Sequence, residues 1–326
     1  MSNSEEKINS NSDSIVIDNK RHRRKKRKII LIIFLIILAV PVYFGLDVFF
    51  RTNNLFDEIN EEVDTVNLRE EQSLPELALG ETPFSVLILG IDSEFPGDPG
   101  RSDAIMVATV NPNEDTSYLV SIARDTRTLI VGRGFDDKIN HAYAFGGAGM
   151  SINTVQHFLN IPIDFYMTLD MDGFGPFVDA VGGVRVYNDT LAFTQGGYSF
   201  PLGYVEMHGD EALAFTRMRM QDPQGDFGRQ QRQRAIVGAM VSEMAGVSAV
   251  TRYQNILKAA ERYMQTDVSL NEMLRISTGY SVALRNVTDL QMRGQGQIIN
   301  GIYYEIIPEY QRLEMSERLR RHLELD

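Results

Sequence analysis

Five arginines lie within the eighteen residues RMRMQDPQGDFGRQQRQR, which run from Arg217 to Arg234 in a chain whose net charge is -12. The guanidinium group is planar and permanently charged, and it grips a phosphate or a carboxylate with two parallel hydrogen bonds. After residue 28 only Lys138 and Lys258 are lysines, so the other positive charges there are arginines. The segment therefore predicts a binding site for an anionic ligand.

The placement of these arginines favours an anion at the start of a helix. Arg217 and Arg219 end one helical pattern, and residues 221–228 form a loop. The first turns of the next helix hold Arg229, Arg232 and Gln233. Cations at a helix N-terminus oppose the helix dipole, so a bound anion should compensate for them. The free N–H groups of a helix N-terminus attract the same ligand, and residues three or four apart share one face.

Asp226 lies just before this second helical pattern, and two interpretations of it stay open. It is either an N-cap residue or a general base held among arginines over a bound phosphate. A carboxylate surrounded by arginines should be a weak base, so orientation of the acceptor could matter more than proton removal. Two interpretations of Arg232 and Arg234 also stay open: they contact an acceptor, or they are ordinary surface charges.

Two aspartates bracket the first predicted loop of the globular part. Asp92 follows the apolar run at 84–90, and Asp103 opens the run at 104–110. In open α/β sheets, ligands gather outside the carboxyl ends of the strands. Mg²⁺ binds through a few carboxylates and completes its shell with phosphate oxygens or water. The pair is therefore either a magnesium site or a pair of turn residues.

Arg124 emerges at the end of the third apolar run, 117–123, next to the same loops. It either contacts the ligand or forms a structural ion pair with Asp125 or another acidic residue. The glycine-rich stretch 144–149 fits a phosphate cradle and a simple bend equally well. The histidines lack the spacing of a metal site, and the chain has neither a G-x-S-x-G motif nor a Walker-type loop, which argues against a hydrolase triad and a P-loop.

Apolar runs and amphipathic stretches alternate through the part of the chain that carries these residues. Continuous β-branched runs are typical of strands buried on both faces, and a 3.6-residue apolar period is typical of helices. Strands are predicted at 84–90, 104–110, 117–123, 164–171, 184–189 and 302–308, and helices at 147–159, 175–184, 209–220 and 231–244. Alternation without a repeat predicts one α/β domain, a central mixed sheet flanked by helices.

The N-terminus has the pattern of a membrane anchor. A basic run at residues 20–28 abuts eighteen uncharged residues, which rise about 27 Å as a helix and, with the residues up to 50, span a hydrocarbon core of about 30 Å. Basic residues stay cytoplasmic. We therefore predict a cytoplasmic tail at 1–28, one transmembrane helix at 29–50, a helical stalk at 51–82 and an extracellular domain at 83–326. A cleaved signal peptide is the rival interpretation, but no A-x-A-like site follows.

The overall composition excludes some classes of protein. The apolar fraction of 43% is enough for a packed core. The acidic balance outside the N-terminal run argues against a nucleic-acid partner, and the position of the basic run beside an apolar span favours membrane topology and anionic lipid over DNA. The absence of cysteine rules out disulfides and zinc-thiolate sites.

Ordered motifs across the chain resemble the LytR-CpsA-Psr family of bacterial cell-wall ligases. They fall in the family's order over residues 84–244, and they are LILGIDS, GRSDAIMVATV, SIARDT, KINHAYAFGG, IDFYMTLDMDGF, DAVGGVRV, LAFTRMR and GDFGRQQRQ. The resemblance implies a membrane-anchored, Mg²⁺-dependent phosphotransferase. Such an enzyme moves a glycopolymer from a polyprenyl (undecaprenyl) pyrophosphate carrier to peptidoglycan through a phosphodiester bond.

The resemblance also implies roles for residues of this chain. It implies a metal site at Asp92 and Asp103, a catalytic role for Asp226 and Arg229, and pyrophosphate contacts from Arg124, Arg217, Arg219, Arg229 and Gln233. It implies an apolar pocket for the prenyl chain, lined from within residues 152–186. No motif is assigned after about residue 245. A hydrolase of prenyl pyrophosphates and a non-catalytic binder of lipid carriers, acting as a regulator, are the alternatives.

Overall fold

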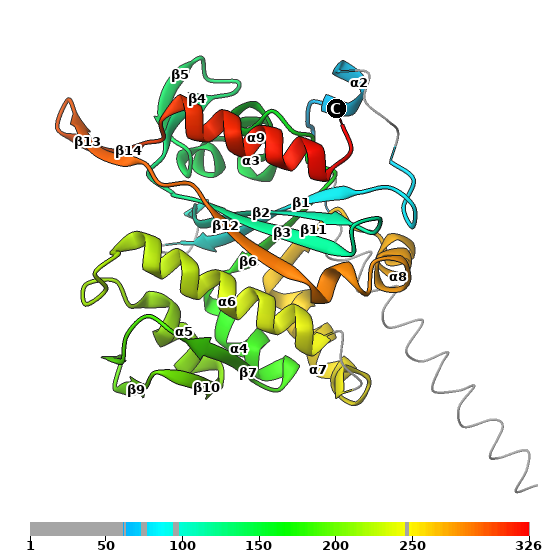
Figure 1. Ribbon diagram of the computed structural model, residues 1–326, viewed down its shortest axis with the longest axis vertical. Helices are drawn as coiled ribbons and strands as arrows, with labels where there is room; N and C mark the ends of the chain where they lie inside the picture. The colour runs from blue at the N-terminus through cyan, green and yellow to red at the C-terminus, as the bar shows by residue number, and fades with distance from the viewer. Residues whose placement is uncertain (1–60, 62, 73–76, 94–97, 245–247, 326) are drawn as a thin grey trace, which may run out of the picture. The chain divides into compact units, whose positions relative to one another are not determined.

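The computed structural model describes residues 61, 63–72, 77–93, 98–244 and 248–325 (Figure 1). The predicted cytoplasmic tail and transmembrane helix lie outside these residues. Among the residues described, no helix combines the length and the apolar composition that crossing a membrane requires. The boundaries predicted for the tail, the membrane segment and the stalk stay predictions.

A six-stranded mixed sheet forms the centre of the domain, which confirms the predicted α/β architecture (Figure 1). Its order is β11-β6-β1-β2-β3-β12. The strands are β1 (Phe84–Asp92), β2 (Arg101–Asn111), β3 (Thr116–Ile122), β6 (Phe165–Asp170), β11 (Met264–Thr266) and β12 (Val287–Gln291). β1, β2 and β3 form an antiparallel meander, β6 runs parallel to β1, and β12 runs parallel to β3. The long apolar runs of the sequence became the four central strands.

Helices cover both faces of this sheet (Figure 1). On one face lie α3 (His141–Leu159) and α9 (Glu309–His322). On the other face lie α4 (Met171–Val181), α5 (Gly209–Arg217), α6 (Asp226–Met244) and α7 (Ser248–Tyr263). Then α8 (Leu270–Gly279) and a short 3₁₀ helix (Ala283–Arg285) lead into β12. The glycine-rich stretch is a bend inside α3, where Gly147 has φ +62° and ψ -153°, a conformation open essentially to glycine alone.

The two faces of the central sheet pack differently. Leu87 and Leu89 of β1 are 0% exposed and belong to one apolar cluster with α3 and α9. Val86 and Ile88 point to the opposite face, because side chains alternate along a strand, and they are only partly buried. The helices on that side pack mainly against each other and against short strands in a separate apolar cluster.

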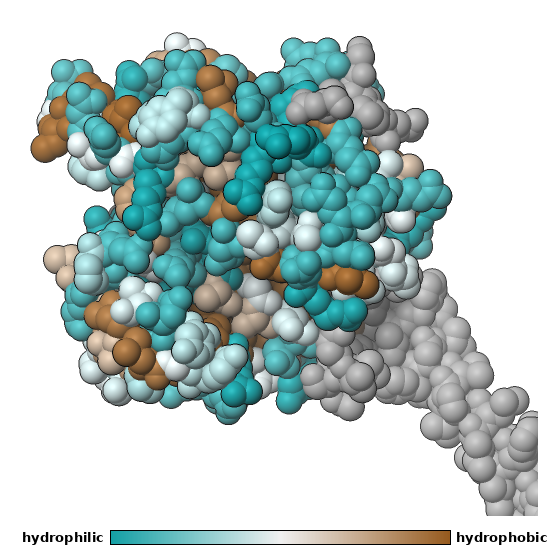
Figure 2. All heavy atoms as spheres, in the orientation of Figure 1, coloured by the Kyte–Doolittle hydropathy of each residue, from teal (hydrophilic) through white to brown (hydrophobic). Residues whose placement is uncertain are grey.

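Four short antiparallel strand pairs lie outside the central sheet in the described part of the chain. They pair β4 (Arg127–Ile130) with β5 (Phe135–Lys138), β7 (Val184–Asn188) with β10 (Gly203–Met207), β8 (Phe193–Gln195) with β9 (Tyr198–Phe200), and β13 (Gln295–Ile299) with β14 (Ile302–Ile306). The sequence predicted β7 and β14 but not their partners. The β13–β14 hairpin extends out from the body, and exposed apolar side chains gather there in the space-filling view (Figures 1 and 2).

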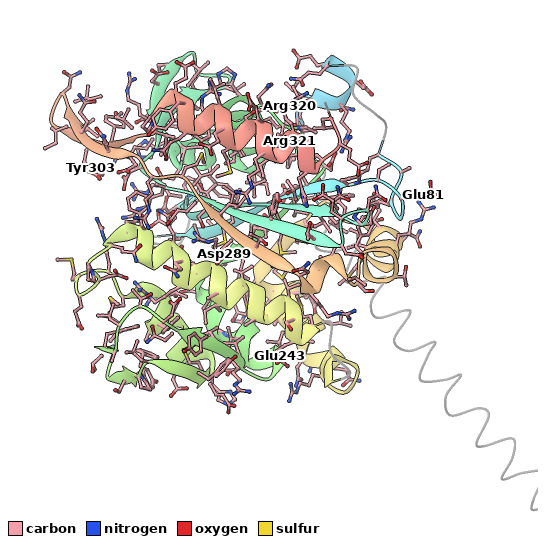
Figure 3. All side chains as sticks on the ribbon, viewed as in Figure 1. Glu81, Glu243, Asp289, Tyr303, Arg320 and Arg321 are labelled. Atoms are coloured by element: carbon pink, nitrogen blue, oxygen red, sulfur yellow. The ribbon has the colours of Figure 1, made fainter. Side chains whose placement is uncertain are left out.

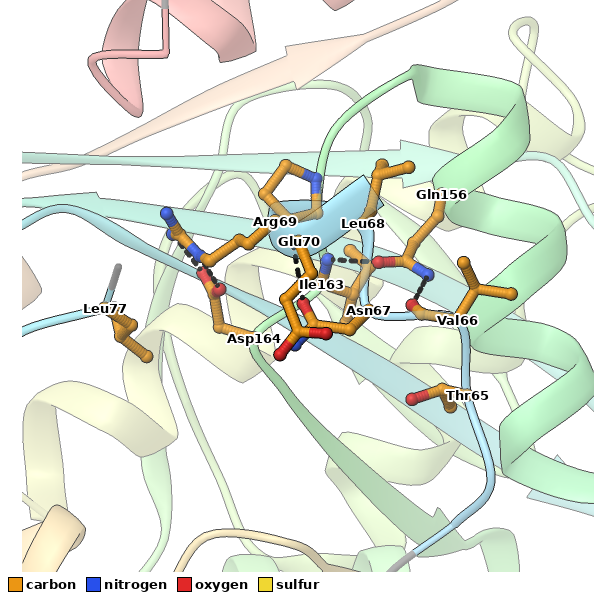
Figure 4. A pocket seen from close by; sticks show the side chains of 11 residues that line it. Thr65, Val66, Asn67, Leu68, Arg69, Glu70, Leu77, Gln156, Ile163 and Asp164 are labelled. Atoms are coloured by element: carbon orange, nitrogen blue, oxygen red, sulfur yellow. Dashed lines mark hydrogen bonds and ion pairs between the residues drawn. The ribbon is translucent and has the colours of Figure 1, made fainter. Parts of the chain in front are cut away.

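The helix predicted through the stalk is wrong for the described part of that segment, where only α2 (Leu68–Glu71) is helical. Instead, irregular backbone is held against the domain by hydrogen bonds (Figure 4). Arg69 Nη2 donates to Asp164 Oδ2 at 2.9 Å, and Gln156 Nε2 donates to the Val66 carbonyl at 3.0 Å. The scattered apolar residues here therefore reflect contacts with the domain and not one helical face.

Candidate active site

Asp103 is the extra residue of a β-bulge between β1 and β2. Ala104 and Ser102 pair with consecutive residues of β1, so the register leaves Asp103 without a partner on that strand. A bulge turns a side chain away from the regular alternation of a strand and is common beside active sites. Asp92, the last residue of β1, lies at the same end of the strand pair. The two predicted metal ligands are thus brought together.

Arg124 follows β3 and binds the bulge residue. Its Nη1 donates to Asp103 Oδ2, while Asn140 Nδ2 donates to the other oxygen at 3.3 Å. Arg124 Nε lies 3.7 Å from Asp125 Oδ2, so Arg124 forms the expected ion pair with Asp125 only as a second, looser contact. Burial would lower the pKa of Arg124, but Asp103, Asp125 and Asp226 outweigh it and raise that pKa. Arg124 is therefore a fixed positive charge.

The pKa of Asp92 depends on residues from two parts of the site. Burial is the largest cause that raises this pKa, and the neighbouring Asp103 raises it further. Arg217, the last residue of α5, acts in the opposite direction on the same pKa. Two carboxylates that disfavour each other's charge suit a bound cation. In the described part of the chain, no group of three or more His, Asp or Glu side chains is placed to hold a metal ion.

Asp226 is the first residue of α6, and both of its oxygens are engaged. Arg229 Nη2 lies 2.7 Å from Oδ1, and Arg219 Nε lies 3.9 Å from the same oxygen. Gln230 Nε2 donates to Oδ2 at 2.9 Å. Asp226 therefore orders the basic side chains around it and offsets the unfavourable position of Arg229 near the helix N-terminus.

The Arg229 side chain is less exposed than those of Arg124 and Arg219, at 14% against 27% and 49%. Burial lowers its pKa, and Arg124 and Arg219 lower it further, against the opposing effect of Asp226 and Asp103. Its Nε atom is buried and makes no hydrogen bond to any described residue. An unpaired buried donor beside other guanidinium groups is costly unless an acceptor binds it. The cluster is thus built for an anion that its own carboxylates do not supply.

All of the predicted site residues except Gln233 interact in this cluster. They come from the end of β1, the bulge of β2, the loop after β3, the end of α5 and the start of α6. They are Asp92, Asp103, Arg124, Arg217, Arg219, Asp226 and Arg229. Gln233 is half-buried one turn further along α6, and no hydrogen bond within the described chain joins it to the others.

Both interpretations of Arg232 and Arg234 are wrong, because these side chains are neither surface charges nor accessible to an acceptor. Arg232 is 5% exposed and Arg234 is 3% exposed. Arg232 donates to the carbonyl of Phe215 at 3.1 Å and lies 2.5 Å from Asp222 Oδ2. Arg232 thus binds a carbonyl at the C-terminal end of α5, where carbonyls without a partner in the helix favour a cation. Arg234 Nη1 donates to Ser121 Oγ at 2.8 Å.

The sequence missed two buried residues beside this cluster, Gln230 and Glu305. Together with Asp226 and Arg219 they line a cavity of about 210 Å³. Gln230 was open to prediction, since it follows Asp226 by four residues on a helix and so shares its face. Glu305 lies on β14, in the part of the chain where no motif was assigned.

Comparison with known proteins identifies the family. The LytR_cpsA_psr family model matches residues 48–321. The chain belongs to the LytR-CpsA-Psr family. This confirms the resemblance carried by the motifs, and the match extends past residue 244, so most of the C-terminal part belongs to the family's domain. The β13–β14 hairpin and most of α9 are therefore part of the LytR-CpsA-Psr unit.

LytR-CpsA-Psr relatives include named transferases. The polyisoprenyl-teichoic acid–peptidoglycan teichoic acid transferase TagU of Halalkalibacterium halodurans is 45% identical over 290 residues, which are 89% of this chain and 95% of the relative. The crystal structure of B. subtilis TagU matches with a TM-score of 0.62 and 38% identity, over 74% of this chain and 97% of that one. A structure of TagT bound to LIIa-WTA matches with a TM-score of 0.65 and 28% identity, over 77% and 94% of the two chains.

Proposed function

We propose that this protein transfers a teichoic acid from a polyisoprenyl (undecaprenyl) pyrophosphate carrier to peptidoglycan and joins the two by a phosphodiester bond. One observation carries the proposal: arginines from three separate segments converge with three aspartates at one end of the sheet. Among them is a buried guanidinium nitrogen for which the described chain supplies no acceptor. The relatives named as TagU transferases cover most of this chain.

The charges of the cluster suit phosphoryl transfer. Such a reaction asks a protein mainly for positioning and for neutralisation of charge on the phosphoryl oxygens. Arg229 would bind the pyrophosphate through its unpaired Nε, with Arg124 and Arg219 close enough to add their charges. A sugar hydroxyl of peptidoglycan would attack the phosphorus next to the donor sugar. The P–O–P bond then breaks, and the prenyl phosphate leaves.

Asp92 and Asp103 would hold Mg²⁺ in this reaction. The residues fit the ion: two carboxylates meet at one end of β1 and β2, and Asp103 raises the pKa of Asp92, a conflict that a cation relieves. Mg²⁺ commonly binds through one or two carboxylates and takes its other ligands from phosphate and water. When bound, it would offset negative charge on the pyrophosphate. Arg124, bonded to Asp103, would fix that carboxylate's orientation.

The prenyl chain of the donor needs apolar surface, and the sheet face toward α4 and α6 offers it. Val86, Ile88, Met167 and Leu169 are apolar and only partly buried there, although the opposite face of the same strands is fully packed. This lining agrees only in part with residues 152–186, the stretch expected from the sequence: Met167 and Leu169 lie within it, whereas Val86 and Ile88 lie outside it. Ile152 and Val155 of α3 are buried in the packed cluster on the other side of the sheet.

The membrane anchor, the cytoplasmic N-terminus and the extracellular position of the domain are part of this proposal. Both substrates support it, because a polyprenyl carrier is held in the membrane and peptidoglycan lies outside it. Protease treatment of intact cells should remove the domain and leave a fragment that begins at the N-terminus. A domain that is protected in intact cells would contradict the proposed topology.

A transfer assay tests the proposed activity. The full-length protein in detergent is mixed with Mg²⁺, a polyprenyl-pyrophosphate-linked teichoic acid oligomer and peptidoglycan glycan strands. We expect teichoic acid covalently joined to the glycan, with release of prenyl phosphate. Release of phosphate-ended oligomer alone, with acceptor present, would identify a hydrolase. Donor binding without either product would identify a carrier-binding protein.

A further inference from the structure

The cavity beside Asp226 differs in character from the arginine cluster. Its wall is formed by the start of α6, by the loop after β3 and by β14. Besides Arg219, the charged groups on it are acidic: Asp125, Asp226 and Glu305. A phosphate placed here would meet three carboxylates, so the cavity is unsuited to the anionic part of the donor.

Two buried oxygens at this cavity lack a hydrogen-bond donor among the residues that the structure describes. Gln230 is 4% exposed and Glu305 is 6% exposed. Gln230 Oε1 and Glu305 Oε1 accept no hydrogen bond from any described residue. Buried acceptors are normally paired, because losing water without gaining a donor is costly. A ligand that brings O–H donors, such as a sugar, would satisfy them.

The carboxylate of Glu305 is held in place by the hairpin and by the loop that carries Arg124. Glu305 N donates to the Asp125 carbonyl at 2.8 Å, which fixes β14 against that loop. Tyr303, labelled on the hairpin in Figure 3, donates its hydroxyl to Glu305 Oε2 at 2.9 Å. A Cβ at Gly294 would lie 2.7 Å from Glu305 Oε1, so a side chain at that position would displace the carboxylate.

The charges around Glu305 favour proton uptake. Burial raises the pKa of its carboxyl, and Asp226 and Asp125 raise it further. The Tyr303 hydroxyl and the backbone N–H of Gly294 act in the opposite direction, but the net direction is upward. Asp226, by contrast, already has both oxygens engaged by Arg229, Arg219 and Gln230.

We infer that this cavity receives the attacking hydroxyl of the peptidoglycan acceptor and that Glu305 accepts its proton. The inference rests on the proposed function. As the hydroxyl oxygen bonds to the donor's near phosphorus, its proton passes to Glu305 Oε1. The P–O–P bond breaks in the same reaction, and its electrons leave with the prenyl phosphate. Glu305 then returns the proton to water, while Asp226 orients the arginines.

Glu305→Gln tests this role, since it keeps the shape of the side chain and removes its basicity. Loss of a general base typically slows a reaction by about 100-fold to 10,000-fold, so we expect kcat to fall by at least about 100-fold. The rate of the wild-type protein should rise with pH through one ionisation, and this limb should be absent in Glu305→Gln. Binding of the polyprenyl-pyrophosphate-linked oligomer and the melting temperature should stay unchanged.

Tyr303→Phe supplies a second readout. It removes the hydrogen bond that lowers the pKa of Glu305, so the rising limb of the pH profile should move to higher pH. Glu309→Gln on α9 is the matched control, because the Glu309 side chain is 81% exposed and should leave rate and profile unchanged.

The possible outcomes distinguish the role of Glu305 from the activity of the whole protein. A wild-type protein that transfers, with Glu305→Gln equal to it in rate and pH profile, overturns only the role of Glu305. Equal loss of donor binding and rate in Glu305→Gln shows a structural role and also overturns it. A wild-type protein that joins nothing to the glycan overturns the proposed function, and the inference falls with it.

Discussion

Arg229 and Asp226 lie three residues apart at the start of α6 and form an ion pair of 2.7 Å, while Arg229 Nε stays buried without a hydrogen bond to any described residue. The carboxylate therefore holds one side of the guanidinium and leaves another side unpaired. Such a geometry orients Arg229 for a ligand before the ligand arrives, which limits the reorganisation needed during the reaction.

Arg229→Ala should lower kcat/KM for transfer by about 100-fold to 1,000-fold, because a preorganised donor to the phosphoryl group is lost. Arg229→Lys should recover little of this, since an ammonium group cannot reproduce the planar fork. Steady-state rates with a melting curve for each variant check both. Arg185→Ala is the control, as the Arg185 side chain is 58% exposed on β7, and a comparable loss there would contradict the assignment.

Asp92→Asn should raise the Mg²⁺ concentration needed for half-maximal transfer by more than about 10-fold, because a carboxylate ligand is replaced by a weaker amide oxygen. The measurement is a Mg²⁺ titration of activity at fixed pH. Asp189→Asn, at an exposed position after β7, provides the matched change outside the site. An unchanged titration curve for Asp92→Asn would remove Asp92 from the metal site.

Asp267→Asn should stabilise the protein at neutral pH. Burial raises the pKa of Asp267 from 3.8 to about 6, although the carboxylate accepts a hydrogen bond from Tyr166 N at 2.8 Å. The folded state thus holds a proton that the unfolded state has lost, and stability falls as pH rises from about 4 to about 6. The melting temperature of the variant should exceed that of the wild type at pH 8, and the difference should vanish below pH 4. A gain that is independent of pH would contradict this cause.

Arg232→Ala should destabilise the domain by about 3–5 kcal/mol, because it leaves the Asp222 carboxylate buried and unpaired. The Asp222 side chain is 0% exposed, and its partner lies 2.5 Å away. Urea denaturation gives the free energy of unfolding. The double variant Arg232→Ala with Asp222→Asn should recover part of the loss, whereas additive losses would show that the pair is not coupled.

The two faces of β1 should respond differently to substitution. Leu87→Ala should lower the free energy of unfolding by about 2–5 kcal/mol, as for other fully buried leucines. Ile88→Ala should cost less, since Ile88 is only partly buried. Ile88→Trp should keep the fold and weaken binding of a polyprenyl-pyrophosphate donor by filling the space for its chain. Unimpaired donor binding in Ile88→Trp would place the prenyl chain elsewhere.

Much of the site was predictable because its residues adjoin strong local patterns. Asp92, Asp103 and Arg124 sit at the ends of long apolar strands, and the order of those strands brings their ends together. Arg232 was harder to predict. It follows Arg229 by three residues and looks alike in sequence, but its burial depends on packing against the end of α5. Helical spacing alone does not predict this contact between two helices.

The C-terminal contribution was not predictable from local patterns. β12 has mostly exposed residues and little apolar alternation, yet it pairs with β3 across about 170 residues of chain, as in Val287 with Ser117. Such pairings depend on the fold as a whole and leave weak local signals. Glu305 reaches the site in the same way, through a bridge between its strand and Thr126.

The order of strands in the sheet has a consequence for truncated forms of this protein. Both edge strands, β11 and β12, come from residues after 263, whereas every predicted phosphate and metal ligand lies before residue 234. A chain ending at residue 244 would keep those ligands but leave β6 and β3 as bare edges with unpaired N–H and C=O groups. Bare edges recruit strands from other molecules. Such a fragment should therefore aggregate, and the C-terminal quarter of the chain protects the solubility of the sheet.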